Sequence, residues 1–382
     1  MKRIAIASLV CLGTGGALAQ SSVTLYGVFD TGLRYTNHAA AGGGHKSEVA
    51  PGLIQGSRWG VRGSEDLGGG ISAQFNLESG LNPDTGTSGQ QGQIFGRQAW
   101  VALGTPYGSL TLGRQFGVAF DTMGSFDPYG IGNQGAISWH LDLTGARFDN
   151  TAKYKGVFGP VAVSLAYSAG EQAGSLRKGQ TLGLAGGYTG SDFTVNTGVQ
   201  QSSDINLNKS TVWMIGGTAT LGAFKVLGGY VNSKRDKGFI RCADNNATSL
   251  AASTPAACGV SASNPYGINS ALSNTNLRAG STLGKASSDL LLLGGAWQAT
   301  DALQFTLGSL YEKVKVDAAN VANAKRATLY AVADYYFSKR TDVYASVDYN
   351  RVASGANAGG SVASFNGFNS QTGLMLGMRH RF

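Results

Sequence analysis

The chain has few charged residues, few prolines and no long apolar segment after its N-terminus. Charged residues make up 14% of the 382 positions, and only 7 positions are proline. The longest later apolar run, 290–297, is far shorter than the roughly 18 residues of a membrane-spanning helix, and glycines interrupt it. A helical membrane protein is therefore excluded, which leaves a soluble domain or a membrane β-barrel.

Cysteine and histidine are too sparse for a metal centre or a catalytic triad. The 3 cysteines show no zinc-ligand spacing, and the 4 histidines form no evident metal pair. Cys242 and Cys258 share one polar segment, so we expect a disulfide between them in an oxidising compartment. The sequence predicts no catalytic residue, no metal, no cofactor and no enzymatic activity.

The formal charge is positive, but the basic residues are dispersed. Lys and Arg number 30 against 22 Asp and Glu, which gives +8 at neutral pH. Such a balance suits anionic surfaces or anionic solutes. No dense block of Lys or Arg is present, which argues against nucleic-acid binding.

The N-terminus has the pattern of a secretory signal peptide. Lys2 and Arg3 precede an apolar stretch over 4–12, and Ala17-Leu18-Ala19 forms a small-residue cleavage site. The apolar stretch is too short for a membrane anchor. We expect residues 1–19 to be removed and residues 20–382 to form one exported β-barrel domain.

The rest of the chain predicts antiparallel strands. Leu303, Phe305 and Leu307 alternate with Gln304 and Thr306, which is the period of a strand with one apolar face. Seven short turns separated by eight long polar connections imply sixteen strands, with both termini on the short-turn side. The expected strands are 23–35, 56–63, 70–80, 95–104, 109–117, 147–155, 160–169, 179–189, 193–203, 210–221, 224–234, 288–299, 303–316, 326–337, 342–352 and 371–382.

Two features favour a membrane barrel over a soluble β-sandwich, in which strands also alternate. Short turns on one side and long loops on the other, with an even strand count, are typical of membrane barrels. Aromatic residues also lie near many strand ends, where they suit the two interfacial girdles. They are Tyr26, Tyr35, Trp59, Trp100, Tyr154, Tyr167, Tyr188, Tyr230, Tyr335, Phe337 and Phe382.

The last expected strand explains how the barrel closes. Leu374, Met378 and Phe382 share one parity, whereas Arg379 and Arg381 share the other. We expect the first set to face lipid and the arginines to face the wet interior, beside the first strand.

Five segments resemble the Gram-negative general porins, most closely their beta-proteobacterial type. They are 23–28 (VTLYGV), 57–68 (SRWGVRGSEDLG), 96–101 (GRQAWV), 107–114 (YGSLTLGR) and the final Arg381-Phe382. The resemblance covers essentially the whole mature chain. It implies an all-β, sixteen-stranded antiparallel barrel in the outer membrane of a Gram-negative bacterium, with a third loop folded into the lumen. It also implies a homotrimer, contact with outer-membrane lipid and lipopolysaccharide, and recognition of Phe382 by the barrel-assembly machinery.

The function implied is a water-filled channel for passive diffusion of small hydrophilic solutes and ions. Charged side chains at the constriction set the selectivity of such a channel. By resemblance, Arg58, Arg97 and Arg147 match the arginine cluster on the porin wall. Strand parity groups Arg62 with Arg58, and Lys153 and Lys155 with Arg147.

The third long connection, 118–146, is the expected constriction loop. Asp121 and Asp127 are its early acids, and they would face the basic wall. Lys313 and Lys315 are expected to extend the basic track. We predict a weak to moderate preference for anions.

Two other functions remain open at this point. The connection 235–287 is unusually long, so the chain could be a substrate-specific outer-membrane channel or an adhesin that uses this loop. An enzyme built on a barrel is disfavoured because no histidine-centred site is evident.

Overall fold

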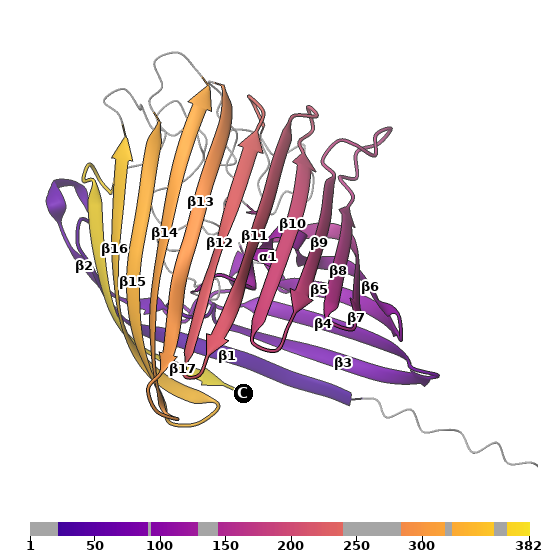
Figure 1. Ribbon diagram of the computed structural model, residues 1–382, viewed down its shortest axis with the longest axis horizontal. Helices are drawn as coiled ribbons and strands as arrows, with labels where there is room; N and C mark the ends of the chain where they lie inside the picture. Colours follow the sequence, from indigo (N-terminus) through magenta and orange to yellow (C-terminus); the bar gives the residue numbers. More distant parts are fainter. Residues whose placement is uncertain (1–21, 91–92, 129–143, 240–283, 318–322, 355–364) are drawn as a thin grey trace, which may run out of the picture.

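The computed structural model describes residues 22–90, 93–128, 144–239, 284–317, 323–354 and 365–382. These residues form one antiparallel sheet that closes on itself (Figure 1). Strand β1 (Ser22–Thr36) pairs with β17 (Ser370–Arg381), from Val28 opposite Arg381 to Thr36 opposite Gly373. Closure pairs the backbone groups that an open edge would leave without partners. The predicted barrel is confirmed.

Short turns and long connections alternate as predicted. The strands between β1 and β17 are β2 (Lys46–Pro51), β3 (Arg58–Gly68), β4 (Ile71–Gly80), β5 (Gln98–Thr105), β6 (Gly108–Phe116), β7 (Arg147–Phe158), β8 (Val161–Ser168), β9 (Thr181–Thr189), β10 (Phe193–Ser203), β11 (Lys209–Leu221), β12 (Phe224–Arg235), β13 (Lys285–Gln298), β14 (Leu303–Asp317), β15 (Ala324–Tyr336) and β16 (Thr341–Ser354). The strand ends that the long connections join lie at one end of the barrel (Figure 1).

One predicted connection contains a strand. β2 pairs with residues 31–36 of β1, and β3 pairs with residues 22–28 of the same edge. The two strands therefore share one position, and the barrel has sixteen positions for its seventeen described strands. The chain leaves the sheet between them because Asp30 accepts hydrogen bonds from the Gln55 amide (2.8 Å) and the Tyr344 hydroxyl (2.7 Å).

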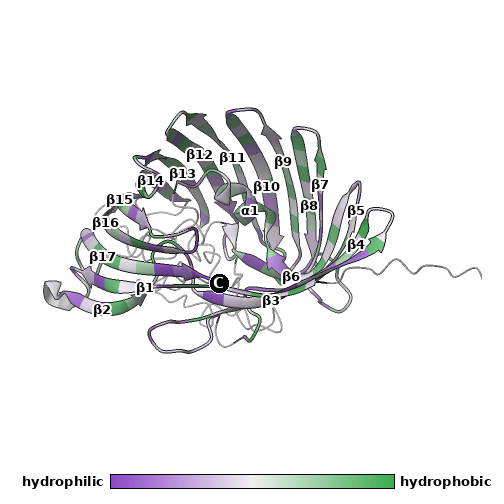
Figure 2. Ribbon diagram, turned by 90° about the horizontal axis from the view of Figure 1, so that it is seen from below, coloured by the Kyte–Doolittle hydropathy of each residue, from purple (hydrophilic) through white to green (hydrophobic). Residues whose placement is uncertain are grey.

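The two faces of the sheet differ as the alternation predicts. Leu374, Leu376 and Met378 are exposed on the outer face. Arg379 lies on the inner face, where it bonds to Asp342 at 3.0 Å. Apolar residues recur along the strands of the barrel wall in Figure 2. The outer face is an apolar band of the kind that contacts hydrocarbon.

The main apolar core lies inside the barrel. Helix α1 (Val118–Gly124) sits within the ring of strands (Figure 2) and packs against β9, β10 and β11. Met123 and Phe126 are fully buried there, together with Met214 and Leu292 of the wall. No helix in the described ranges is long and apolar enough to cross a membrane. The expected signal peptide and both Cys242 and Cys258 lie outside the described residues.

Candidate channel constriction

The loop after β6 is attached to the barrel wall by one glutamine. The Gln200 side chain on β10 accepts a hydrogen bond from the Ala119 amide (3.1 Å) and donates one to the Thr144 carbonyl (2.7 Å). It therefore joins the start and the end of the loop to the same strand. Gly117 and Ala146 add a backbone bond of 3.1 Å between the two ends.

Glycines on the inner wall leave room for this loop. A Cβ atom at any of them would overlap or crowd a loop side chain: Val118, Thr122, Phe126 or Pro128. These glycines lie on five successive strands and are Gly183, Gly198, Gly216, Gly229 and Gly294. Their lack of side chains allows the loop to lie directly on the wall.

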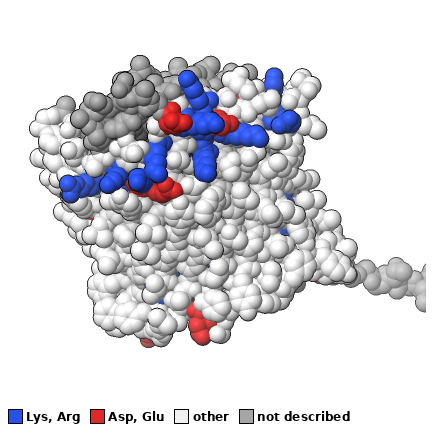
Figure 3. Space-filling model, turned by 45° about the horizontal axis from the view of Figure 1, so that its top comes forward, with Lys and Arg blue, Asp and Glu red and all other residues white. Residues whose placement is uncertain are grey.

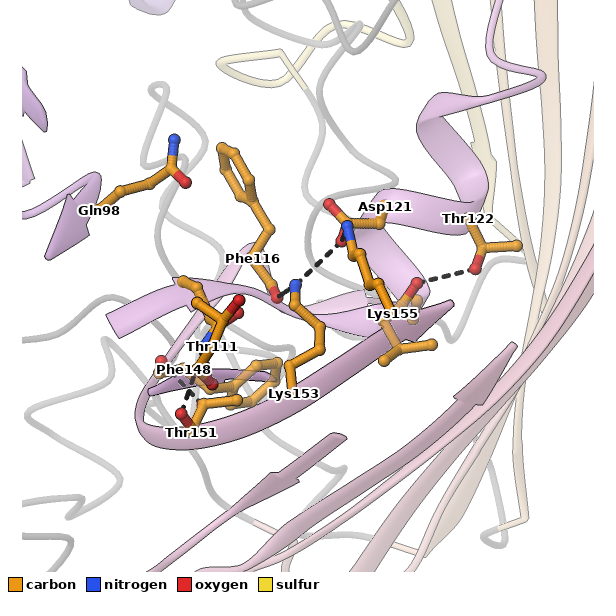
Figure 4. A network of polar contacts seen from close by, with 12 residues as sticks. Gln98, Thr111, Phe116, Asp121, Thr122, Phe148, Thr151, Lys153 and Lys155 are labelled. Carbon is orange, nitrogen blue, oxygen red and sulfur yellow. Dashed lines mark hydrogen bonds and ion pairs between the residues drawn. The ribbon is translucent and has the colours of Figure 1, made fainter. Parts of the chain in front are cut away.

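Asp121 of α1 faces two lysines of β7. Its carboxylate accepts hydrogen bonds from the amino groups of Lys153 (3.0 Å) and Lys155 (2.8 Å), which reach toward α1 in Figure 4. Lys153 also donates to the Phe116 carbonyl at 2.7 Å. Burial by itself would raise the pKa of the Asp121 carboxyl, but the two lysines outweigh it and hold that pKa below its ordinary value.

A second charged cluster joins Arg58 and Arg97. Glu78 on β4 lies between them, with its carboxylate 2.7 Å from Arg97 Nε and 3.5 Å from Arg58 Nε. The Tyr26 hydroxyl donates to the same carboxylate at 2.9 Å. Arg62 lies over the Tyr26 ring, 5.1 Å from its centroid. These contacts hold five side chains of the wall in one arrangement.

Sequence reasoning missed Glu78 and misplaced Tyr26. Tyr26 was expected in a membrane girdle, but it faces the lumen opposite Gly60, where no side chain excludes it. Glu78 also pairs with Gly60, on the other side of β3. The register shifts by one residue between Asp66 and Gly68, so the short turn at 69–70 would not by itself have placed Glu78 opposite Gly60.

Arg147 lies apart from the shared face predicted for it. The register shifts between Gly113 opposite Thr151 and Gln115 opposite Phe148, so one extra residue interrupts the alternation of β7. The Arg147 guanidinium lies 4.7 Å from the centroid of the Phe116 ring. Arg147 therefore lies at the start of the loop, where its guanidinium contacts the ring of Phe116. The carbonyl of the same Phe116 accepts the hydrogen bond from Lys153.

Three other predicted positions lie away from the candidate constriction. Asp127 is only 2% exposed and lies beyond the end of α1, so it does not face open water as Asp121 does. Lys313 and Lys315 share the outward parity of Leu307 and Tyr311, so their assignment to the basic track was wrong. Comparison with that apolar parity in the sequence would have placed them outside.

The described residues show no arrangement suited to a metal ion. Within them, no group of three or more His, Cys, Asp or Glu side chains could hold one. Asp121 instead forms direct ion pairs between the loop and the wall, and Glu78 forms ion pairs within the wall. Fixed charges of this kind act on solutes through their charge.

Comparisons with known proteins agree with this architecture. The family described as Gram-negative porin matches residues 5–355. An outer membrane porin of Bordetella pertussis is 38% identical over 177 residues, 41% of this chain and 44% of the relative. Outer membrane porin protein 32 of Delftia acidovorans is 34% identical over 232 residues, 58% of this chain and 63% of the relative. The chain thus spans about half to two thirds of the length of these curated relatives.

A solved structure has the same fold. The anion-selective porin from Comamonas acidovorans has a TM-score of 0.68 and 22% sequence identity to this chain, covering 95% of this chain and 100% of the other. The family match covers most of the closed barrel, including the loop that packs inside it. The chain belongs to the Gram-negative porins, the β-barrel proteins of the bacterial outer membrane.

Proposed function

We propose that this protein forms a water-filled channel for passive diffusion of small hydrophilic solutes and ions, with a weak to moderate preference for anions. The observation that carries the proposal is the loop packed inside the barrel, with Asp121 in direct ion pairs with Lys153 and Lys155 of the wall. A loop that narrows the lumen between fixed charges limits both the size and the sign of what passes.

The balance of charge supports the preference for anions. Six cations stand on the wall near the loop and β3–β7, against the carboxylates of Glu78, Asp121 and Asp127. We propose that these cations form the basic wall: Arg58, Arg97, Arg147, Arg62, Lys153 and Lys155. Asp121 is proposed as the acid of the loop that contacts solute. Asp127 is proposed as a second acid of the loop, which is buried and does not contact solute.

Planar-bilayer recording of the purified protein in a salt gradient tests the proposal. We expect the current to rise in steps as channels insert, and the reversal potential to have the sign that corresponds to a preference for anions. Replacing Arg58, Arg97 and Arg147 with glutamine should move that potential toward cations. A control with Arg177, Lys339 and Arg340 replaced removes the same charge from exposed positions and should leave the potential unchanged. Absence of conductance, or equal shifts in both variants, would reject the proposal.

Assembly and processing belong to the same proposal. We infer that residues 1–19 are removed as a signal peptide, that the barrel forms a homotrimer, and that its final residue is recognised by the barrel-assembly machinery. The outer face of β5 and β6 supports a subunit contact, because Val101, Leu103, Leu110 and Leu112 form an exposed aliphatic patch there. Arg114, two residues after Leu112 on β6, forms an ion pair with Asp149 of β7 at 2.6 Å. Lipid and lipopolysaccharide would contact the remaining outer face.

Cys242 and Cys258 are proposed to form a disulfide in the connection after β12. Family membership favours a general channel without enzymatic activity over a substrate-specific channel or adhesin. Graded, saturable block of the current by one solute would instead favour a specific channel, and hydrolysis of lipid or peptide substrates by the purified protein would reveal an enzyme.

A further inference from the structure

The chain between β2 and β3 forms a second inward segment, residues 52–57. Leu53 is 1% exposed and belongs to the same apolar cluster as Met123 and Phe126 of the loop after β6. The segment therefore lies inside the barrel, as that loop does, and not on the rim. Asp30 of β1 is the residue that attaches it to the wall.

Asp30 binds this segment with its side chain and with its backbone. Its carboxylate accepts hydrogen bonds from the Gln55 amide (2.8 Å) and the Tyr344 hydroxyl (2.7 Å). Its amide donates to the Ser57 hydroxyl oxygen (2.9 Å), and its carbonyl accepts from the same hydroxyl (2.8 Å). The carbonyl also accepts from the Gly52 amide at 2.8 Å. Asp30 thus holds the segment at its start, its middle and its end.

The packing around Asp30 leaves the segment no room to shift. A Cβ atom at Gly52 would lie 1.8 Å from the carboxyl carbon of Asp30, so only glycine allows this approach. The Leu53 amide donates to the Tyr344 hydroxyl (2.9 Å), which itself donates to Asp30. Asp30 is completely buried. Without its carboxylate, the Gln55 amide would lose its acceptor inside the barrel, which is costly for a buried donor.

The far end of the segment holds Arg58. The Gly56 carbonyl accepts a hydrogen bond from the Arg58 guanidinium at 2.9 Å. Glu78 is farther away, 3.5 Å from Arg58 Nε, and its shorter contact, 2.7 Å, is with Arg97. The segment therefore provides the closer of these two contacts of Arg58, and Asp30 binds the residues on both sides of Gly56.

Arg58 points into the barrel. Its neighbour Trp59 is 39% exposed on the outer face, so the alternation of β3 turns Arg58 inward. On the outer face seen in Figure 3, few charged side chains lie between the two ends of the barrel. Arg58 is thus placed where its charge acts on the lumen and where the segment 52–57 can contact it.

We propose that Asp30 is a positioning residue for Arg58: by holding the segment 52–57, it fixes the Arg58 guanidinium in the channel and so contributes to the preference for anions. This rests on the proposed function, in which Arg58 belongs to the basic wall. A charge held at one point of the wall acts more strongly on a passing ion than one that moves in water. Asp30 itself contacts no solute, because it is completely buried.

Reversal potentials of purified variants in planar bilayers test the proposal. Asp30→Asn keeps the size of the side chain and removes the carboxylate that binds the segment. Ser57→Ala removes the hydroxyl that bonds to the Asp30 backbone and changes no charge, so it decides the question if the first variant fails to fold. Asp348→Asn is the matched control, because Asp348 is also buried and pairs with Arg34 at 2.9 Å.

The sign of the shift separates positioning from a simple change of charge. Removing a negative charge favours anions by itself, so Asp348→Asn should leave the preference for anions unchanged or stronger. We expect Asp30→Asn and Ser57→Ala to shift the reversal potential toward cations, in the direction of Arg58→Gln and by no more than that variant does. A shift of Asp30→Asn toward anions, or an equal shift toward cations in the control, would overturn the proposal.

A double-mutant cycle tests whether the effect passes through Arg58. In an Arg58→Gln background, neither Asp30→Asn nor Ser57→Ala should shift the potential further, whereas additive shifts would show that Asp30 acts in another way. Wild-type selectivity in both single variants, beside a clear shift in Arg58→Gln, would contradict the positioning role alone. A wild-type protein that never conducts would contradict the channel, and the positioning role would fall with it.

Discussion

The ring of Phe126 lies directly against Gly216, at a point on the inner wall where any side chain would occupy the same space. Phe126 is fully buried, although it belongs to a loop and not to the barrel. The contact shows how a barrel can hold a loop in its lumen: a large apolar side chain on the loop meets a wall position without one. The width of the channel therefore depends on the wall as well as on the loop.

Replacing Gly216 with leucine should displace Phe126 and raise single-channel conductance. Forcing a side chain into this packed contact should cost roughly 1–3 kcal/mol of loop packing. The matched control is Gly186→Leu, because a Cβ atom at Gly186 meets nothing closer than 3.9 Å. Bilayer recording of both variants checks the prediction, and equal conductance in the two would contradict it.

Replacing Asp121 with asparagine should increase the preference for anions, because Lys153 and Lys155 lose their carboxylate. The pKa of Asp121 lies below its ordinary value of about 4, so the carboxylate stays charged from neutral pH down to that range. The stability that the pairing contributes is present above the ordinary pKa and is lost as pH falls through the lowered one.

The pH dependence of the reversal potential provides a second test of the role of Asp121. The reversal potentials of wild type and Asp121→Asn should differ by a constant amount between pH 7 and about 4 and converge below that range. Convergence near neutral pH would show that the lysines do not hold the carboxylate in its charged form.

Replacing Glu78 with glutamine should destabilise the barrel and increase anion preference. Arg58 and Arg97 would lose the carboxylate between them, and removing one partner of a buried ion pair costs roughly 3–5 kcal/mol. Glu65→Gln is the control, since Glu65 is exposed on the neighbouring strand. Thermal unfolding in detergent should distinguish the two variants, and matching transitions would refute a structural role for Glu78.

Replacing Phe382 with alanine should lower the amount of folded barrel in cells. The purified variant should still refold in detergent as well as the wild type does. The Phe382 backbone exchanges hydrogen bonds of 3.0 and 3.1 Å with Gly27, and alanine can keep both. The side chain is 50% exposed, so its loss removes little packing. Phe337→Ala tests another exposed phenylalanine, in the turn after β15. Equal yields of both variants in outer-membrane fractions would argue against an assembly signal.

Strand parity could be read from the sequence because it depends only on neighbouring residues. It placed Leu376 outside and Arg379 inside, and it located nearly all strands within a few residues. It failed where one residue interrupts the period, as between Phe148 and Thr151, since a bulge inverts every later assignment. It also failed at β2, whose short polar sequence resembles a loop.

The sequence by itself therefore determined a closed barrel of sixteen strand positions and its two faces, because turn length and a period of two are local properties. The loop in the lumen was an expectation from the resemblance to the Gram-negative porins. Only the tertiary structure decided which charges meet. Glu78 lies between Arg58 and Arg97 because hydrogen-bond registers bring three strands together. Lys209 and Arg351, far apart in the sequence, lie in one run of neighbouring strands only because β11–β16 pair in order around the barrel. Contacts between distant residues depend on the closed sheet, and no local pattern encodes them.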